Sequence, residues 1–408
     1  MITHSYYECD SRVRRYAESL AERGDSLDII ALRSGPELPR KEAFCGVTLH
    51  RIQDRFGLPK KTTVSYLWPL LRFLFASSRY LNRLNREKRF DLIHVHNIPD
   101  FLVFAAWYPK LQGARVILDI HDMMPELYSS KFSKSANSIF VRSLKVMEKA
   151  SAAAADHVIL PNHLWHQKYI TRSAKGEKCS VFMNNVDGRI FKRHSPLLKN
   201  GKRILMFPGS LHWHQGLDIA IEAFHKLHLK MPEAVFHIYG EGDMKPQLRA
   251  MVNRLGLNEK VRFFNAVPLE DMADLMAHAD LGLVPKRADS FGNEAYSTKI
   301  MEFMAVGVPT VVSDTKIDRH YFNDSIVRFF ESGNSDLMAD AILDMLANVE
   351  GRRNMILRAS EYVDQNSWKS RESDYLHLVD SLCVHARTSA GRNNLLMSLL
   401  ATCVLIAN

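Results

Sequence analysis

Several features that mark other classes of protein are missing from this chain of 408 residues. Its five cysteines are scattered and include no CxxC pair, which argues for a reducing compartment and against a disulfide framework or a zinc site. No stretch reaches the roughly 20 apolar residues of a spanning helix, and the N-terminus lacks the apolar core of a signal peptide. No zinc-finger spacing or aromatic RNA-binding signature is present, so nucleic acid is not an expected partner. We therefore expect a cytoplasmic protein.

The composition is that of a globular protein with an anionic partner. Apolar residues make up 46% of the chain and charged residues 24%, and the length suffices for two domains. The formal net charge of +9 suits sugar nucleotides, lipid phosphates or an anionic membrane. The last stretch, LLMSLLATCVLIAN, is apolar but too short to span a bilayer. A packed helix, a disordered tail and an interfacial anchor all remain open for it.

Short β-rich runs alternate with helical patterns from end to end, which predicts parallel sheets with crossover helices. The predicted strands of the first half are 2–5, 27–32, 91–95, 115–119, 157–160 and 180–184, and its helices include 12–23, 100–111 and 138–154. After the basic stretch FKRHSPLLKNGKR, a second alternation runs through RILMFPG, AVFHIYGEG, VRFFNAV, LGLVP and PTVVSD. We predict an N-terminal Rossmann-like domain over 1–190, a linker over 191–202 and a C-terminal Rossmann-like domain over 203–365. The C-terminal helices and apolar tail would occupy 366–408.

The most informative segment is FGNEAYSTKIMEFMAVGVPTVVSD, which places Glu294 and Glu302 eight positions apart. Carboxylates accept hydrogen bonds from hydroxyls, so one could hold a sugar and the other a ribose. Ser297 or Thr298 could cap the helix that begins between them, whose free N–H groups and dipole favour a diphosphate. Lys299 stands where its ammonium could meet that diphosphate. Two glutamates at this spacing are also common in helical proteins, so the surrounding motifs must decide.

Further segments in the same order resemble one family. They read DSRVRRYAESLAERG, FDLIHVHN, VILDIHD, ADHVILPN, FMNNVDGRIF, FPGSLHWHQGLDIAI and YGEGD. Together with the glutamate pair they resemble the retaining glycosyltransferases of family 4 over roughly residues 1–380. The resemblance implies the α/β architecture called GT-B, in which two doubly wound Rossmann-like domains face each other across the active-site cleft. It also implies transfer of a hexose from a nucleotide-diphosphate donor to a saccharide acceptor in cell-surface polysaccharide synthesis.

The resemblance assigns site residues as well. Glu294 matches the family's first glutamate and would contact the donor sugar, and Glu302 matches the second and would hold the ribose. His121, at the end of ARVILDIHD, matches the histidine of the first domain that reaches the donor sugar. An imidazole at the carboxyl end of a strand can hydrogen-bond a sugar hydroxyl or stabilise developing charge. We predict His121 and Glu294 as the catalytic residues, whereas His94 and His96 fit a structural role better.

The glycine loop that opens the second domain departs from the family pattern. Members commonly carry an arginine and a lysine there to grip the diphosphate, whereas this loop has Ser210 and Gln215 between Gly209 and Gly216. We expect these four residues to bind the donor together with Lys299. The remaining positive charge would come from Lys286, Arg287, histidines or helix N-termini.

Two other departures concern the first domain and the metal. The first-domain loop reads SYYECD and lacks the glycine pair of many members, so Asp10 and Arg12 could supply acceptor contacts or pair with each other. No DxD motif stands where a metal would serve a diphosphate. In GT-B enzymes helix N-termini and cations usually replace the metal, so we predict metal independence and no cofactor.

Residues 60–90 form a basic, aromatic-rich stretch. Its large apolar residues include Trp68, Leu71, Phe73 and Phe75, and its basic residues include Lys60, Lys61, Arg72, Arg79, Arg83 and Arg86. Such an element can lie in the interface of an anionic membrane. An ordinary crossover helix with a solvated basic face explains the pattern too. By family analogy, membrane contact predicts a peripheral protein on the inner face of the plasma membrane and a polyprenyl-diphosphate-linked acceptor.

Two other functions remain open from the sequence. A sugar-nucleotide 2-epimerase has the same architecture and binds the same ligand, but it needs acid and base groups around the sugar ring. A non-catalytic partner subunit would explain the missing cations of the glycine loop and the short first strand.

Overall fold

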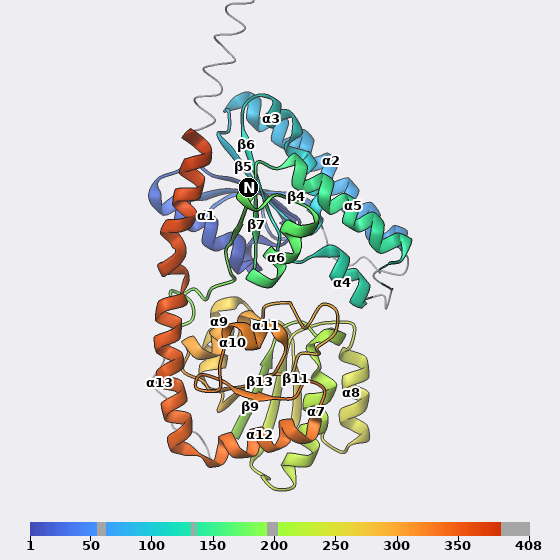
Figure 1. Cartoon of the computed structure of the whole chain (residues 1–408), viewed down its shortest axis with the longest axis vertical. Coiled ribbons are helices and arrows are strands. Elements are labelled where there is room, and N and C mark those ends of the chain that lie inside the picture. The colour runs from blue at the N-terminus through green and yellow to red at the C-terminus, as the bar shows by residue number, and fades with distance from the viewer. Residues whose placement is uncertain (55–62, 132–134, 136, 194–202, 385–408) are drawn as a thin grey trace, which may run out of the picture. The chain divides into compact units, whose positions relative to one another are not determined.

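The computed structural model describes residues 1–54, 63–131, 135, 137–193 and 203–384, and it divides into two compact units (Figure 1). The first unit contains Met1–Pro125, Asn137–Met183 and the segment that starts at Glu372; the second contains Glu126–Ala136 and Asn184–Arg371. Most of the predicted linker, at 194–202, and the predicted apolar tail, at 385–408, lie outside the described residues. Among the helices that are described, none has both the length and the apolar character of a membrane span.

The first unit is built on an eight-stranded sheet in the order β3-β4-β2-β1-β5-β6-β7-β8. The strands are β1 (Ile2–Thr3), β2 (Asp28–Arg33), β3 (Lys41–Phe44), β4 (Val47–Asp54), β5 (Leu92–His96), β6 (Arg115–Asp119), β7 (His157–Leu160) and β8 (Cys179–Val181). All neighbours pair in parallel except β3 with β4. The first strand, predicted over 2–5, has only two residues, yet it lies inside the sheet and pairs on both sides.

Helices connect these parallel strands, as the alternating sequence pattern predicts. The α-helices are α1 (Ser11–Arg23), α2 (Thr63–Glu87), α3 (Trp107–Leu111), α5 (Ile139–Ala154) and α6 (His163–Arg172), and the 3₁₀ helices are η1 (Tyr7–Cys9), η2 (Asp100–Ala106) and η3 (Gly176–Lys178). Helix α4 (Met124–Lys131) leads out of this unit into the second. Residues 368–384 form a further helix.

Helix α1 shows how local sequence sets an element of the first unit. Its N-cap, Asp10, accepts a hydrogen bond from the Val13 backbone N–H at 3.2 Å, and Gly24 ends the helix with a φ of 97°. Between these signals, residues with the i, i+3, i+4, i+7 spacing of one helix face are buried; they are Val13, Tyr16, Ala17 and Leu20. The predicted helix 12–23 is thus confirmed.

The second unit is built on a six-stranded, fully parallel sheet in the order β11-β10-β9-β12-β13-β14. The strands are β9 (Arg203–Pro208), β10 (Ala234–Tyr239), β11 (Val261–Phe264), β12 (Leu281–Val284), β13 (Thr310–Ser313) and β14 (Arg328–Phe330). The helices are η4 (Trp213–Gln215), α7 (Leu217–His228), α8 (Lys245–Arg254), α9 (Leu269–Ala277), α10 (Thr298–Ala305), α11 (Lys316–Tyr321), α12 (Ser335–Ala347) and α13 (Val349–Asn366). This strand order is that of a doubly wound Rossmann sheet.

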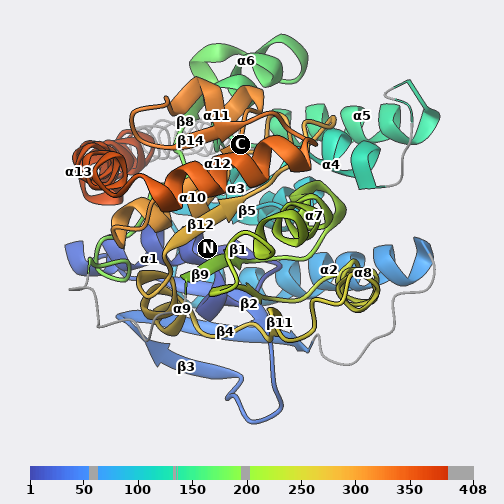
Figure 2. The ribbon, with the colours of Figure 1, turned by 90° about the horizontal axis from the view of Figure 1, so that it is seen from below.

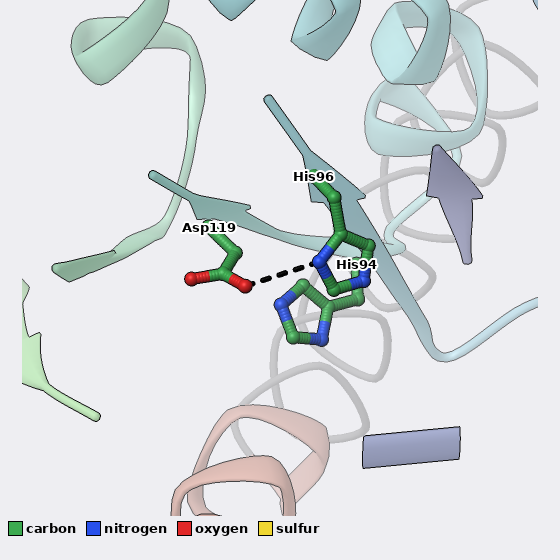
Figure 3. A group of neighbouring side chains, drawn as sticks. All are labelled: His94, His96 and Asp119. Atoms are coloured by element: carbon green, nitrogen blue, oxygen red, sulfur yellow. Dashed lines mark hydrogen bonds and ion pairs between the residues drawn. The ribbon is translucent and has the colours of Figure 1, made fainter. Parts of the chain in front are cut away.

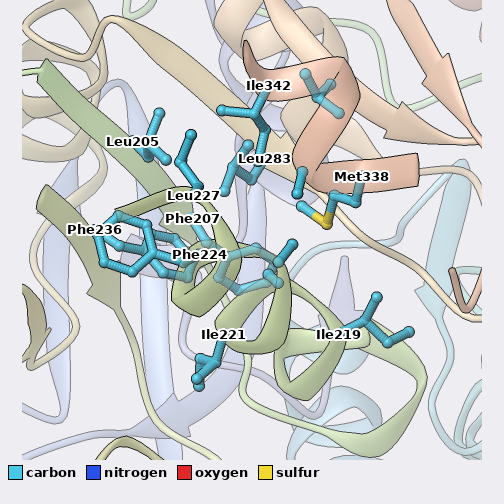
Figure 4. Close-up of a cluster of buried hydrophobic side chains, with 14 of the residues drawn as sticks. Leu205, Phe207, Ile219, Ile221, Phe224, Leu227, Phe236, Leu283, Met338 and Ile342 are labelled. Atoms are coloured by element: carbon cyan, nitrogen blue, oxygen red, sulfur yellow. The ribbon is translucent and has the colours of Figure 1, made fainter. Parts of the chain in front are cut away.

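Alternate residues of the central strands fill two hydrophobic layers, one on each face of the second sheet. Leu205 and Phe207 of β9 point into a cluster with Phe224 of α7 and Ile342 of α12 (Figure 4). Met206, between them in sequence, belongs to the cluster on the other face, which includes the buried residues of α10. Helices α7 and α12 pack side by side over the first layer (Figures 1 and 2). The sheet is therefore a rigid support for the loops that leave its strands.

Candidate active site

The second sheet has a topological switch point between β9 and β12. From β9 the chain proceeds outward through β10 and β11, and it then returns to the other side for β12, β13 and β14. Open parallel sheets bind ligands at the carboxyl ends of the strands that flank such a point. The loop after β9 contains Gly209 and Gly216, and the loop after β12 leads to Glu294. The predicted donor residues of this unit therefore share one edge of the sheet.

The glycines of the loop after β9 permit close approaches that a side chain would prevent. Gly216 has a φ of 65°, and a Cβ there would lie 1.9 Å from the backbone oxygen of Pro285, which follows β12. Gly209 has a φ of 129°, and a Cβ there would lie 2.5 Å from Cε of Lys299. A Cβ at Gly240, after β10, would lie 1.9 Å from the backbone oxygen of Gly209. The loop is thus packed against its neighbours and against Lys299.

Lys299, on the first turn of α10, is a cation that lies against this loop. Its Nζ donates to Oε1 of Gln215 at 3.3 Å and lies 5.2 Å from the ring centroid of Phe207. Burial lowers the pKa of Lys299 to about 8, although the carboxylate of Glu302 opposes the shift. Among the described residues, no carboxylate lies within ion-pair distance of this ammonium. The structure therefore joins Gly209, Gln215 and Lys299, as the sequence predicts.

Gln215 also links this lysine to a histidine that the sequence did not single out. The Gln215 side chain is buried, and its Nε2 lies 3.0 Å from Nε2 of His214. Burial, with His212 and Lys299 nearby, lowers the pKa of His214 to about 4, so this imidazole is neutral at pH 7. Ser210, the other predicted donor residue of the loop, is exposed. His214 adds a neutral polar group and no charge to the site.

The segment that carries Glu294 is anchored by a buried lysine. Lys286 pairs with Asp318 of α11 at 2.9 Å and donates to the backbone oxygen of Ala295 at 2.7 Å. Asn293 ties the same segment to α11, because its Oδ1 accepts from the Lys316 N–H at 2.8 Å. Lys286 is therefore a structural cation inside the unit. The expectation that it would neutralise a phosphate is wrong.

Arg287 is engaged as well, and α10 begins without a side-chain cap. The Arg287 guanidinium pairs with Asp218 and lies 3.7 Å from the ring centroid of Trp213. Ser297 is the N-cap of α10, as predicted, but its side chain makes no capping hydrogen bond and its Oγ is buried without a partner. Glu294 and Glu302 stand on either side of this start, one in the preceding loop and one inside the helix. The free N–H groups of α10 and the Lys299 ammonium thus form one positive region.

In the first unit, the centre of the candidate site is the buried carboxylate of Asp119, at the end of β6. Arg12 of α1 binds it through two parallel hydrogen bonds, Nε to Oδ2 at 2.8 Å and Nη2 to Oδ1 at 2.6 Å. Arg12 also donates to the Phe182 backbone oxygen at 2.7 Å. Burial alone would raise the pKa of Asp119, but the guanidinium holds it well below its usual range. Arg12 thus pairs with Asp119, and Asp10 caps α1.

Two histidines of β5 lie beside this carboxylate (Figure 3). Nδ1 of His96 is 3.0 Å from Oδ2 of Asp119, and the His94 and His96 rings stack with centroids 4.2 Å apart. Nδ1 of His94 is 3.0 Å from the Tyr375 hydroxyl. Burial lowers the pKa of both histidines, so both are neutral. The structural role predicted for His94 and His96 agrees with their complete burial.

His121 follows β6 and reaches the surface from this buried cluster. Its Nε2 lies 3.2 Å from Oδ2 of Asp119, and its side chain is 19% exposed. Its backbone N–H donates to Oδ1 of Asn97 at 2.6 Å, and Asn97 in turn donates to the Asp122 backbone oxygen at 2.8 Å. The sequence predicted a catalytic role for His121, but nothing in the sequence showed that Asp119 and Asn97 would hold it.

His94, His96 and Asp119 also lie close enough together to be considered as metal ligands. Both oxygens of Asp119 already accept hydrogen bonds from Arg12, whose positive charge would repel a metal ion. Nδ1 of His94 is occupied by the Tyr375 hydroxyl. The donor set of this cluster therefore does not fit a metal site.

Comparison with known proteins identifies both halves of the chain. Residues 9–185 match the family model described as glycosyl transferase 4-like domain, and residues 188–362 match the model described as glycosyl transferases group 1. The phosphatidyl-myo-inositol mannosyltransferase of Mycobacterium leprae is 26% identical over 383 residues, which cover 91% of this chain and 92% of the relative.

Solved structures agree at the level of the fold. The sucrose-phosphate synthase of Thermosynechococcus elongatus superposes with a TM-score of 0.75 at 18% identity, over 94% of this chain and 98% of that one. HepE of Anabaena, solved in complex with UDP and glucose, superposes with a TM-score of 0.70 at 16% identity, over 93% and 98% of the two chains. These are glycosyltransferase structures of the GT-B type. Two matched domains, the relatives and the fold together place this chain among the family 4 glycosyltransferases, as a transferase with GT-B architecture.

Proposed function

We propose that this transferase is a retaining, metal-independent enzyme that moves a hexose from a nucleoside-diphosphate donor to a saccharide carried on a lipid. The observation that carries the proposal is the Lys299 ammonium, which lies against the glycine loop without a carboxylate partner among the described residues. A buried cation in this state favours an anion. Diphosphates bind at helix N-termini on switch-point edges, where Lys299 lies.

The roles of the other residues follow from this placement of the diphosphate. Gly209, Ser210, Gln215 and Gly216 would line its path along the loop after β9. Glu302, inside α10, would accept hydrogen bonds from the ribose hydroxyls. Glu294, in the loop before α10, would accept them from the sugar. His121 is the candidate residue of the first unit and would hydrogen-bond a substrate hydroxyl. The relative solved with UDP and glucose supports this class of donor.

The proposed reaction retains the configuration at the anomeric carbon. The acceptor hydroxyl attacks that carbon from the side of the leaving group, so the new carbon–oxygen bond forms as the bond to the phosphate oxygen breaks. The hydroxyl proton passes to an oxygen of the departing diphosphate. The Lys299 ammonium and the N–H groups of α10 stabilise the negative charge that develops on this group, which is where the largest share of the rate enhancement usually arises.

The diphosphate role of Lys299 is tested by binding of UDP and GDP to Lys299→Met at several pH values. A charge-assisted hydrogen bond contributes about 1.5–3 kcal/mol, so we expect affinity to fall roughly 10- to 100-fold at pH 7. Because the pKa of Lys299 is about 8, binding to the wild type should weaken as the pH rises above 8, whereas the variant should lose this dependence. Lys226→Met removes a surface lysine paired with Asp336 and is the matched control. Equal affinity of the wild type and Lys299→Met would refute the assignment.

Transfer itself is tested with Glu294→Ala. A thermal-shift panel of nucleotide sugars, with and without a chelator, first identifies the donor through stabilisation of the folded chain. We expect the variant to keep its fold and to lose transfer, and the chelator to change neither binding nor turnover. Incubation of the donor alone separates transfer from epimerisation, because an epimerase converts the donor without an acceptor. Turnover retained by Glu294→Ala would remove this residue from the proposed mechanism.

Helix α2 supports a lipid-linked acceptor presented at the inner face of the plasma membrane. One face of the helix is buried and includes Phe73, so this member of the predicted aromatic set belongs to the core. Trp68 and Phe75 are each 66% exposed and share the opposite face with four exposed arginines, namely Arg72, Arg79, Arg83 and Arg86. Lys60 and Lys61 lie outside the described residues. Arginines beside exposed aromatic rings suit an anionic lipid surface.

Helix α5 of the same unit also has exposed apolar residues. Both α2 and α5 pack on η2 within the first unit. On α5, Ile139 is 87% exposed and Val146 is 69% exposed. The mycobacterial relative, by its name, acts on a phosphatidyl-inositol, which is a lipid acceptor. The proposal of a lipid-linked acceptor rests on the exposed aromatic and basic face of α2 and on the name of this relative.

Vesicle sedimentation tests the membrane contact. We expect the wild type to bind vesicles that contain phosphatidylglycerol, to bind phosphatidylcholine vesicles weakly, and to dissociate in high salt. Trp68→Ser/Phe75→Ser should reduce binding, whereas Leu357→Ser, which changes an exposed leucine of α13, should not. Equal binding to both lipids, or no effect of the double variant, would contradict this part of the proposal.

A further inference from the structure

We infer that Asp119, oriented by Arg12, is a positioning residue that fixes His121 in its Nε2–H tautomer and leaves Nδ1 to accept a hydrogen bond from a substrate hydroxyl. The inference deepens the proposed function, since it takes from that function the contact between His121 and substrate. It assigns a role to an ion pair that the mechanism above does not use.

Three nitrogen atoms lie close to one oxygen of the Asp119 carboxylate. Oδ2 of Asp119 lies 2.8 Å from Nε of Arg12, 3.0 Å from Nδ1 of His96 and 3.2 Å from Nε2 of His121. Nε of Arg12 always carries a hydrogen, because the guanidinium does not lose its proton in proteins. Its two parallel bonds hold the carboxylate plane, so Oδ2 cannot turn away from the two imidazoles.

The carboxylate also determines where His96 and His121 carry their ring hydrogens. Nδ1 of His96 and Nε2 of His121 are 3.2 Å apart, so a single hydrogen could in principle lie between them. That arrangement would leave a bare nitrogen lone pair of His121 facing the Asp119 anion. With a hydrogen on each nitrogen, both rings instead donate to Oδ2, which is the stronger acceptor because it is charged. The carboxylate therefore selects Nδ1–H on His96 and Nε2–H on His121.

The far side of the His96 ring supports this assignment. Nε2 of His96 is buried and has no hydrogen-bond partner. A hydrogen on Nε2 would therefore have no acceptor, whereas a hydrogen on Nδ1 donates to the charged oxygen of Asp119, so the second arrangement is the more stable one. Burial lowers the pKa of His96, which keeps the ring neutral with its one hydrogen on Nδ1. That hydrogen then points at Asp119.

The other ring nitrogen of His121, Nδ1, is left for a ligand. The ring is held through Nε2, and its backbone is held by the Asn97 side chain at 2.6 Å. Among the described residues, Nδ1 of His121 has no hydrogen-bond partner, and the side chain is partly exposed. In this tautomer the imidazole presents a lone pair at Nδ1. The ligand group that it selects is a hydroxyl or another donor.

The wild-type protein provides the first test, by long-range proton–nitrogen NMR correlation of histidine labelled with ¹⁵N in the ring. The His121 signals are assigned by their absence from His121→Asn. We expect a single tautomer with the hydrogen on Nε2, and slow exchange of that hydrogen with water. A hydrogen on Nδ1, or a rapidly exchanging mixture of tautomers, would overturn the inference whether or not any variant folds.

The second test removes the ion pair as a unit. Arg12→Leu/Asp119→Leu leaves no unpaired buried charge, and such replacements are often close to neutral for stability. We expect the protected Nε2 hydrogen of His121 to be lost and transfer to fall at least tenfold; loss of a tautomer-fixing aspartate can reach about 10⁴-fold in a serine protease. His94→Gln disturbs the same cluster at Tyr375 without contacting His121, and it should keep the native His121 signals. Unchanged His121 signals in the double variant would refute positioning by Asp119. Full transfer by His121→Asn would refute the proposed site role of His121 instead.

Discussion

Gly216 and Gly256 have almost the same backbone conformation but very different surroundings. Their φ angles are 65° and 68°. A Cβ at Gly216 would meet the Pro285 backbone oxygen, whereas one at Gly256 would meet nothing within 4 Å. A side chain at Gly256 would therefore meet only the strain of the left-handed backbone, which costs roughly 1–2 kcal/mol. A side chain at Gly216 would meet the same strain and a steric clash as well.

Alanine substitutions at these two glycines should differ in their effects. We expect Gly256→Ala to lower the melting temperature by a few degrees. Gly216→Ala should lower it further and also weaken UDP binding, because Pro285 cannot move without shifting the loop that leads to Glu294. Thermal unfolding with and without UDP measures both effects. Equal shifts for the two variants would show that the contact with Pro285 is unimportant.

The places of the candidate site residues in the fold were predictable where they lie within a motif. The positions of His121, Glu294 and Lys299 follow from strand ends and a helix start that can be read from a few neighbouring residues. The Arg12–Asp119 pair joins residues 107 positions apart, so its existence depends on how α1 packs on the sheet. For the same reason the sequence could not show that Lys286 turns inward to Asp318.

At the scale of elements, one buried ion pair attaches the Glu294 loop to α11. Burial lowers the pKa of Lys286, and it raises the pKa of Asp318, so each group depends on the other for its charge. Lys286 also binds the Ala295 backbone oxygen, next to Glu294. Removal of the lysine alone would leave an unpaired buried carboxylate, which costs about 3–5 kcal/mol.

We therefore expect Lys286→Met to destabilise the second unit strongly and to weaken donor binding. Lys286→Met/Asp318→Asn should regain part of the stability, because no charge is left unpaired. It should not regain donor affinity, since the bond to Ala295 is still missing. Urea unfolding and titration with UDP separate the two outcomes. A double variant as unstable as the single one would show that the ion pair is not the source of the effect.

Most elements were predictable from alternating β-rich and helical patterns, and the exceptions have local causes. The hairpin of β3 and β4 turns at Cys45 and Gly46, with φ angles of 49° and 78°. Cysteine is not a residue that signals a left-handed turn, so this hairpin was missed. The predicted helix 100–111 is divided into η2 and α3. Strand β14 has only three residues, too few to show a pattern.

At the scale of the whole molecule, buried neutral histidines make stability depend on pH. Burial lowers the pKa of His94 and His96, and it lowers the pKa of His157 and His214 to about 4. In the unfolded chain the same histidines bind protons below about pH 6.5. The unfolded state then holds more protons, so stability falls as the pH drops from about 6.5, by up to roughly 1.4 kcal/mol per pH unit for each histidine.

The melting temperature should accordingly decrease between pH 7 and pH 5. His157→Gln/His214→Gln removes two of the four groups and should show a shallower decrease, even if it is less stable at pH 7. Thermal unfolding of both proteins in buffers of matched ionic strength gives the comparison. Identical slopes for the two proteins would mean that other groups cause the acid sensitivity.

The first unit contains chain segments that are far apart in the sequence and are therefore synthesised at different times. Tyr375 lies in a segment that groups with this unit, where its ring centroid is 4.3 Å from that of Tyr16 and its hydroxyl contacts His94. A ribosome must therefore synthesise the entire second unit before the first can be completed. The two matched domains end at residues 185 and 362, so fragments cut at those limits would lack this tyrosine. Attempts to produce the first domain alone should include the segment around Tyr375 as a separate or fused piece.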